Sequence, residues 1–286
     1  MSQGKNVLIA GFGDIGQRLA PLLLKQGAQV TAMRRSPMSA PDGVNVLQGD
    51  VTSSQVLLNV AQEHHIQWLY LIVTPQAYTE ADYRGTYLAA AQAVATLVEQ
   101  YQGLEHVVFV SSTSVYAQTQ GEWVDESSPT IPQAHSGKVL LASEQVIEQT
   151  GIGCNVRFSG IYGPGRNRLI QQVKDGKGSA HKPVQFTNRI HADDCARVLA
   201  HVYAMAESGQ PLARCYLASD SAPVSMADVK HWIAQRLNLP RDHLQASNVA
   251  AGRGSKRCSN QRLLDSGFAF RYPSFKEGYG ELLNES

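Results

Sequence analysis

The chain has 286 residues and a formal net charge of +1. This length is enough for one large α/β unit or for a domain with a smaller lobe. The near-neutral charge, with no extended basic stripe, argues against a nucleic-acid-binding protein. The first apolar run follows residues 1–5 directly and no stretch approaches the length of a membrane span, so we expect a cytoplasmic protein with no membrane partner.

A predicted strand, a glycine loop and a helix open the chain. Residues 7–10 are all apolar, which suits a parallel strand covered on both faces. In the following Gly-x-Gly-x-x-Gly loop, Gly11 permits a tight turn, Gly13 leaves room for a pyrophosphate and Gly16 lets the next helix pack closely. The free amides and the dipole of that helix attract phosphates. This order predicts a dinucleotide cofactor in contact with the whole loop: Gly11, Phe12, Gly13, Asp14, Ile15 and Gly16.

The end of the predicted second strand, residues 30–33, bears on the choice of nucleotide. In a dinucleotide fold an acidic residue at this place accepts a hydrogen bond from the adenine ribose. This chain has Arg34 and Arg35 instead. Two guanidiniums suit a 2′-phosphate, so the sequence favours NADP over NAD. The alternative is a solvated basic turn.

Later strands are expected to deliver residues to the same sheet edge, where ligands bind. The predicted third strand ends before Asp50 and Val51, and the Asp50 carboxylate would reach the adenine amine. The unbroken apolar run 68–73, typical of a central parallel strand, ends at Val73 and Thr74. We expect these four residues to contact the cofactor.

Strands and helices alternate further along the chain. Apolar spacing predicts helices at 53–64, 81–101, 138–149 and 225–237, and strands at 106–110, 154–158, 183–187 and 215–217. Residues 188–194 lead into a further predicted helix, which has Asp193 and Asp194 in its first turn and runs through Glu207. With the glycine loop first, this alternation predicts an α/β fold with a Rossmann-type doubly wound parallel sheet. We expect a dinucleotide-binding domain over 1–158, to which 188–217 returns, and a smaller substrate-binding lobe over 159–187 and 218–286.

Four consecutive hydroxyl side chains follow the predicted strand 106–110: Ser111, Ser112, Thr113 and Ser114. So many hydroxyls at the end of a buried strand are unusual for packing alone, because each needs a partner once water is excluded. We therefore expect a catalytic or substrate-orienting role for this segment.

The four cysteines are scattered through the chain without a Cys-x-x-Cys pair: Cys154, Cys195, Cys215 and Cys258. Buried reduced thiols are the simplest interpretation. His191, Asp193 and Asp194 lie close to one of them, but their spacing matches no recognised zinc pattern, so we expect no metal.

Several short motifs carry a resemblance to a known family by their order and spacing: residues 11–16, 83–86, 111–116, 161–166, 189–194, 264–268 and 273–274. The chain resembles the extended short-chain dehydrogenase/reductases, the NAD-dependent epimerase/dehydratase family, over nearly its whole length. The resemblance implies a nicotinamide cofactor across the sheet edge and a small C-terminal lobe that closes over a nucleotide-sugar-like substrate.

Position by position, the resemblance implies that Ser112 hydrogen-bonds the reacting oxygen and that Arg189 lies near the substrate's phosphates. Lys138 would serve both catalysis and cofactor binding, and Ser111 would contact the cofactor. The substrate-binding residues implied in this way are Thr113, Ser114, Tyr162, Arg166 and Arg189.

The chain departs from the family at the acid-base position. The family's tyrosine stands four residues before the lysine, where this chain has Ala134, and no tyrosine lies between Tyr116 and Tyr162. This pattern is similar to an atypical branch in which cofactor binding persists without the active tyrosine. Further departures from the family pattern are Ala10, Asp82 and Gly160.

A serine without an activating base is a poor proton acceptor near neutral pH, so Ser112 alone does not replace the phenol. His135, adjacent to the vacated position, is one substitute because imidazole titrates near neutrality. Tyr116 and Tyr162 are other phenols near the expected cleft. We expect an NAD(P)-dependent oxidoreductase, epimerase or dehydratase acting on a nucleotide sugar or related polar alcohol or carbonyl.

The alternative function is a non-catalytic NAD(P)-binding sensor or regulatory protein, because a fold alone does not establish an enzyme. By analogy with the family, helices 81–101 and 138–149 would pair two copies of the chain as a homodimer.

Overall fold

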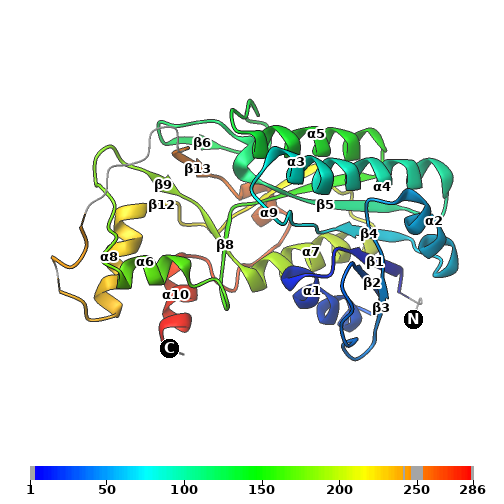
Figure 1. Ribbon diagram of the computed structural model, residues 1–286, viewed down its shortest axis with the longest axis horizontal. Coiled ribbons are helices and arrows are strands. Elements are labelled where there is room, and N and C mark those ends of the chain that lie inside the picture. Colours follow the sequence, from blue (N-terminus) through cyan, green and yellow to red (C-terminus); the bar gives the residue numbers. More distant parts are fainter. Residues whose placement is uncertain (1–3, 241, 246–253, 285–286) are drawn as a thin grey trace. The chain divides into compact units, whose positions relative to one another are not determined.

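The computed structural model describes residues 4–240, 242–245 and 254–284 (Figure 1). These residues fall into two compact units. The described residues of the first unit lie within Met1–Val115, Thr130–Arg157 and Ala196–Tyr216. Those of the second lie within Tyr116–Pro129, Phe158–Cys195 and Leu217–Ser286.

A seven-stranded sheet forms the centre of the fold, with the strand order β11-β7-β5-β4-β1-β2-β3. The strands are β1 (Asn6–Ala10), β2 (Gln29–Arg34), β3 (Val44–Gln48), β4 (Trp68–Leu71), β5 (His106–Ser112), β7 (Gly153–Phe158) and β11 (Cys215–Ala218). The pairs formed among β1 to β5 are all parallel. The order changes direction beside β1, because β2 and β3 continue on one side and β4 and β5 on the other. This is the doubly wound Rossmann topology, so the predicted fold class is confirmed.

Helices cover both faces of the sheet, because the apolar side chains on both faces must be buried. The larger ones are α1 (Asp14–Lys25), α2 (Ser54–Glu63), α4 (Ala89–Gln100), α5 (His135–Gln149) and α7 (Ala192–Glu207). Figure 1 shows α4 and α5 along one side of the parallel strands and α1 and α7 along the other. Residues 7–10 of β1 are fully buried, as expected for a central strand between two helical layers.

Two helices differ from their predicted bounds. The segment expected as one helix from 81 to 101 consists of α3 (Glu80–Tyr83), a π-helical turn η1 (Arg84–Leu88) and α4. The π turn contains Gly85, and glycine is a weak helix former. Helix α5 begins at His135, three residues before the predicted start, with Ala134 as an extended N-cap.

The second unit contains short strand pairs and small helices. Strands β8 (Gly160–Tyr162) and β10 (Arg189–His191) pair in parallel, as do β6 (Glu122–Val124) and β13 (Lys256–Cys258), whereas β9 (Phe186–Thr187) and β12 (Val224–Ser225) are antiparallel. Strand β9 is shorter than the predicted strand 183–187. The helices are α6 (Arg168–Lys174), α8 (Met226–Arg236), α9 (Gln261–Asp265) and α10 (Phe275–Asn284).

An apolar cluster between α6, α8 and α10 forms the core of this unit and includes Val173, Ile233, Phe275 and Tyr279. The Asp194 carboxylate accepts hydrogen bonds from the backbone N–H groups of Arg271 (3.0 Å) and Tyr272 (2.8 Å) and so ties the tail of the chain down.

All four cysteines are reduced and buried, as predicted.

Candidate functional site

The glycine loop joins β1 to α1 at the point where the strand order changes direction. Gly11 has φ +100°, and a Cβ there would collide with the carbonyl oxygen of Ile72. A Cβ at Gly16 would lie 3.2 Å from the carbonyl oxygen of Gly11, which shows how closely α1 packs on the loop. A Cβ at Gly13 would meet no described atom within 4 Å. The space beside Gly13 is therefore open to a ligand, and the loop fits the close approach of a pyrophosphate.

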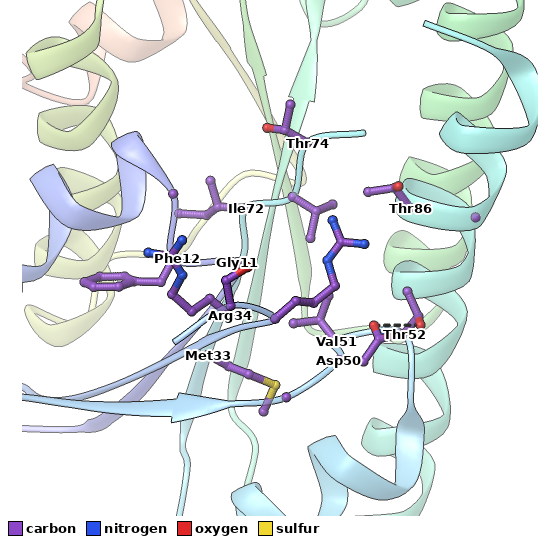
Figure 2. A pocket seen from close by; sticks show the side chains of 16 residues that line it. Gly11, Phe12, Met33, Arg34, Asp50, Val51, Thr52, Ile72, Thr74 and Thr86 are labelled. Atoms are coloured by element: carbon purple, nitrogen blue, oxygen red, sulfur yellow. Dashed lines mark hydrogen bonds between the residues drawn. The ribbon is translucent and has the colours of Figure 1, made fainter. Parts of the chain in front are cut away.

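A pocket lies in front of this loop within the first unit; it is called here the glycine-loop pocket (Figure 2). It brings together nine residues expected to bind the cofactor: Gly11, Phe12, Gly13, Arg34, Arg35, Asp50, Val51, Val73 and Thr74. These residues come from the ends of β1, β2, β3 and β4, because the carboxyl ends of parallel strands meet at one edge.

Other residues of the pocket were not anticipated from the sequence: Met33, Ser36, Gly49, Thr52, Ile72, Gly85 and Thr86. Most of them adjoin a predicted residue in the chain. Gly85 and Thr86 come instead from the π turn η1. The signal in the sequence that could have indicated them is the family motif at residues 83–86.

The remaining residues predicted to bind the cofactor do not line the glycine-loop pocket. Asp14 lies in the first turn of α1 and pairs with Arg18 at 2.9 Å. Ile15 and Gly16 are buried where α1 meets the sheet. Ser111, near the end of β5, is buried, and Lys138 lies in the first turn of α5.

The polar groups of the glycine-loop pocket have distinct partners. Arg34 Nη1 lies 2.9 Å from Met38 Sδ, and Figure 2 shows the Arg34 side chain beside Gly11 and Phe12. Asp50 Oδ1 accepts hydrogen bonds from the backbone N–H (2.9 Å) and the hydroxyl (2.8 Å) of Thr52. The Thr52 backbone hydrogen bond is the main influence that lowers the pKa of Asp50, and Arg35 adds to it. Asp50 is therefore a carboxylate at neutral pH.

The serine segment 111–114 packs on the first turn of α5. The carbonyl oxygen of Ser114 lies so close to Gly137 that a Cβ at residue 137 would collide with it. Ser112 Oγ accepts a hydrogen bond from the Ser114 backbone N–H at 3.2 Å. Among the described residues, the buried Ser111 Oγ has no hydrogen-bond partner. The serine segment thus lies, through Ser114, against the turn that carries Lys138, whose side chain is exposed.

His135 begins α5 beside the vacated tyrosine position. Its ring centroid lies 5.0 Å from that of Tyr78 and 5.5 Å from that of Tyr83, both in edge-to-face geometry. Its Nε2 is buried and makes no hydrogen bond to any described residue. The other two phenols considered from the sequence are engaged in the second unit. Tyr116 donates to the Asp125 carbonyl at 2.7 Å, and Tyr162 donates to the Ser274 carbonyl at 3.3 Å.

A separate pocket lies wholly within the second unit; it is called here the second-unit pocket. Its lining is Ile161, Tyr162, Arg166, Arg168, Leu169, Gln172, Met226 and Tyr279. Tyr162 and Arg166 were predicted to bind substrate, whereas Arg168 and Gln172 on α6 carried no sequence signal. Burial raises the pKa of Tyr162, so its phenol stays protonated. Arg189 is not part of this lining; it is buried, with Nη1 donating to Thr187 Oγ1 at 2.7 Å.

Thr113 and Ser114 belong to the first unit, where Thr113 is buried and Ser114 is exposed.

No helix in the described part of the chain is both long enough and apolar enough to span a membrane. Residues 4–240, 242–245 and 254–284 contain no cluster of three or more His, Cys, Asp or Glu side chains placed to hold a metal ion.

The chain is similar to known proteins over most of its length. The model of the family described as "NAD dependent epimerase/dehydratase family" matches residues 7–213. Protein YeeZ of Escherichia coli K12 is 25% identical over 283 residues, which cover 94% of this chain and 97% of YeeZ. A solved structure from Methylobacillus flagellatus, described as a candidate NAD-dependent epimerase/dehydratase, has 35% identity, covers 98% of both chains and gives a TM-score of 0.81. MoeE5, solved with UDP-glucose and NAD, has 23% identity, covers 98% of this chain and 97% of its own, and shares the fold with a TM-score of 0.80.

The chain belongs to the NAD-dependent epimerase/dehydratase family. The resemblance inferred from the short motifs is thereby confirmed. The family is NAD-dependent by its description, and the MoeE5 structure contains NAD.

Proposed function

We propose that the chain is an NADP-linked oxidoreductase, epimerase or dehydratase that acts on a nucleotide sugar or a related polar alcohol or carbonyl. The observation that carries the proposal is the glycine-loop pocket, in which an open space beside Gly13 adjoins two guanidiniums. Family membership supports the dinucleotide, and the chemistry of the pocket supports the added phosphate.

The preference for NADP rests on Arg34 and Arg35 at the end of β2. Both line the pocket, and guanidiniums bind phosphate oxygens with paired, charge-assisted hydrogen bonds. Asp50, the acidic residue of the lining, follows β3 and is held by Thr52. The other carboxylate oxygen of Asp50 would accept a hydrogen bond from the adenine amine. The two arginines would then bind the ribose phosphate.

The bound cofactor would supply hydride exchange at its nicotinamide ring. The chain would orient the substrate with the Ser112 hydroxyl as a donor to the reacting oxygen. The Lys138 ammonium, in the adjacent turn of α5, would favour negative charge at the acid-base group. His135 is the acid-base candidate that the sequence supplies, although its Nε2 is buried.

Substrate recognition is proposed for the second-unit pocket. Arg166 and Arg168 offer guanidiniums for a diphosphate, and the stacked rings of Tyr162 and Tyr279, with centroids 4.6 Å apart, offer an apolar wall. Thr113, Ser114 and Arg189 stay predicted substrate contacts.

Two measurements test the proposed function. Calorimetry with NADP and NAD should show binding of both, with NADP the tighter ligand. The protein is then incubated with either nucleotide and a panel of nucleotide sugars while the absorbance of the reduced nicotinamide is followed. Binding of neither nucleotide would overturn the whole assignment. Tight binding without turnover of any substrate would favour the sensor function.

A homodimer is also proposed, through the exposed sides of α4 and α5. Light scattering of the pure protein should give twice the mass of the chain, and a monomer mass would remove the proposal.

A further inference from the structure

Tyr78 brings a phenol to the first turn of α5. It lies in the loop between β4 and α3, and its Oη is 2.9 Å from Ser136 Oγ. The Tyr78 side chain is 68% exposed, whereas Ser136 is 4% exposed, so a solvent-accessible phenol is held by a buried hydroxyl. Ring packing on His135 fixes the orientation further, with centroids 5.0 Å apart.

Other polar groups of the proposed active site lie at or next to the same turn of α5. The serine segment reaches it through the Ser114 carbonyl, which lies against Gly137. Lys138 follows directly, with an exposed side chain. The first unit therefore gathers a phenol, a serine segment and a lysine around residues 136–138, although the phenol comes from a different element than the helix.

We propose that Tyr78 is the acid-base residue of this chain, a phenol supplied by the β4–α3 loop in place of one on α5. This inference rests on the proposed function. In the oxidative direction, the Tyr78 oxygen takes the hydroxyl proton of the substrate alcohol, so the substrate O–H bond breaks and the phenol O–H bond forms. The bound cofactor would accept the carbinol hydrogen with its electron pair, so that the alcohol becomes a carbonyl. Reduction runs the same transfers backwards.

Two features of α5 lie beside the Tyr78 hydroxyl. Ser136 can donate a hydrogen bond to it, and α5 is a 15-residue helix whose N-cap, Ala134, gives no side-chain cap. The free N–H groups and positive dipole end of such a helix stabilise a nearby anion.

The other titratable groups that face Tyr78 do not oppose this effect. The rings of His135 and Tyr83 carry no negative charge at neutral pH. The nearby carboxylates of α3 have other partners. Glu80 pairs with Arg84 at 2.9 Å, and Asp82 accepts from the Thr79 hydroxyl at 2.6 Å.

Neighbouring phenols are less suited to the role. Burial raises the pKa of Tyr83, and it raises the pKa of Tyr87 to about 12. Tyr83 and Tyr87 therefore hold their protons more firmly than an ordinary tyrosine does. In the second unit, Tyr116 and Tyr162 already donate to backbone carbonyls.

The experiment compares Tyr78→Phe with Tyr83→Phe, which removes a hydroxyl from the same aromatic cluster. Tyr78→Phe should lower kcat by about 10²- to 10⁴-fold, the usual contribution of a general acid or base, with NADP affinity unchanged. Tyr83→Phe should keep kcat within about twofold of the wild type. If both variants behave alike and retain activity, Tyr78 is not the acid-base residue; loss of activity in His135→Gln alone would give the role to His135.

A second readout needs no substrate. Near-ultraviolet difference absorbance follows phenolate formation as pH is raised, with and without NADP. The phenol absorbance of the wild type should change when NADP is bound, and Tyr78→Phe should lack this change. The same NADP-dependent change in both proteins would overturn the inference. Failure of the proposed function would be seen separately, as wild-type protein that binds no nucleotide or turns over no substrate.

Discussion

Arg157 on β7 and Glu144 on α5 form a buried, doubly hydrogen-bonded ion pair. Arg157 Nη2 lies 2.7 Å from Glu144 Oε2, and Nε lies 2.9 Å from Oε1. The two side chains are 6% and 1% exposed. Glu144 belongs to α5, whose first turn carries His135 and Lys138. The ion pair therefore fixes the position of α5 on the sheet.

Removing one member of the pair should destabilise the fold strongly. Glu144→Leu takes the Glu144 carboxylate away from the buried Arg157 guanidinium, and breaking a buried pair in this way costs about 3–5 kcal/mol in comparable cases. Urea unfolding monitored by circular dichroism measures the loss. The double variant Glu144→Leu with Arg157→Met removes both charges and should recover most of it. A loss below about 1 kcal/mol in the single variant would contradict a buried pair of this kind.

Gly13 and Gly11 should respond differently to alanine. Gly13 has φ −90° and ψ −159°, which alanine adopts readily, and its Cβ would enter open space. Gly13→Ala should therefore change the free energy of unfolding by less than about 1 kcal/mol but weaken nucleotide binding by at least about tenfold.

Gly11→Ala is the contrasting variant. The positive φ and the collision with the Ile72 carbonyl should lower the melting temperature as well as abolish nucleotide binding. Thermal scans with calorimetry of the same samples separate the two effects. Unchanged nucleotide affinity in Gly13→Ala would show that the pyrophosphate does not approach this loop.

The arginines at the end of β2 should set the preference for NADP. Arg34→Ser and Arg35→Ser each remove a guanidinium from the pocket, and a hydrogen bond to a charged group contributes about 1.5–3 kcal/mol. NADP affinity should fall by about 10- to 100-fold, while NAD affinity in the same titrations serves as the internal control. Equal losses of affinity for the two nucleotides would show that the arginines do not bind the ribose phosphate. The segment would then be a solvated basic turn.

Nine residues that the sequence placed at one edge of the sheet line the glycine-loop pocket, because they lie close in the chain to the strand ends. A buried strand followed by Gly11, Gly13 and Gly16 specifies its own turn, and the parallel topology brings the strand ends to one edge. The residues that follow each strand could therefore be placed without a structure. Thr86 could not be placed in this way, because it reaches the pocket from the π turn η1 and not from the end of a strand.

Long-range contacts in irregular segments could not be predicted. Tyr78 and Ser136 are separated by 58 positions, and the loop that carries Tyr78 has no periodicity to orient its side chain. The second-unit pocket was anticipated only through Tyr162 and Arg166, since α6 has too few residues to show an amphipathic pattern. Asp220 likewise had no sequence signal, because its burial depends on the packing of the second unit around it.

Asp220 is a buried carboxyl group that is only half satisfied. It is 1% exposed; Oδ1 accepts from the Ala222 backbone N–H at 3.2 Å, and Oδ2 has no partner among the described residues. Desolvation raises the pKa of Asp220 to about 7, although the Ala222 hydrogen bond and the Arg189 charge act against it. The folded protein therefore prefers this side chain protonated, whereas the unfolded chain ionises it near pH 3.8.

This difference gives Asp220 a defined effect on stability. Because its folded pKa lies above its unfolded pKa, its stabilising contribution is complete below about pH 4 and is lost as pH rises through about 7. The loss is on the order of 4 kcal/mol, at about 1.4 kcal/mol for each pKa unit. Asp220→Asn carries no titrating proton, so its free energy of unfolding, measured in urea between these pH values, should lack this decline. The two proteins should match at the acid end, and the variant should be the more stable at the alkaline end. Parallel pH profiles would show that Asp220 ionises in the folded protein as it does in water.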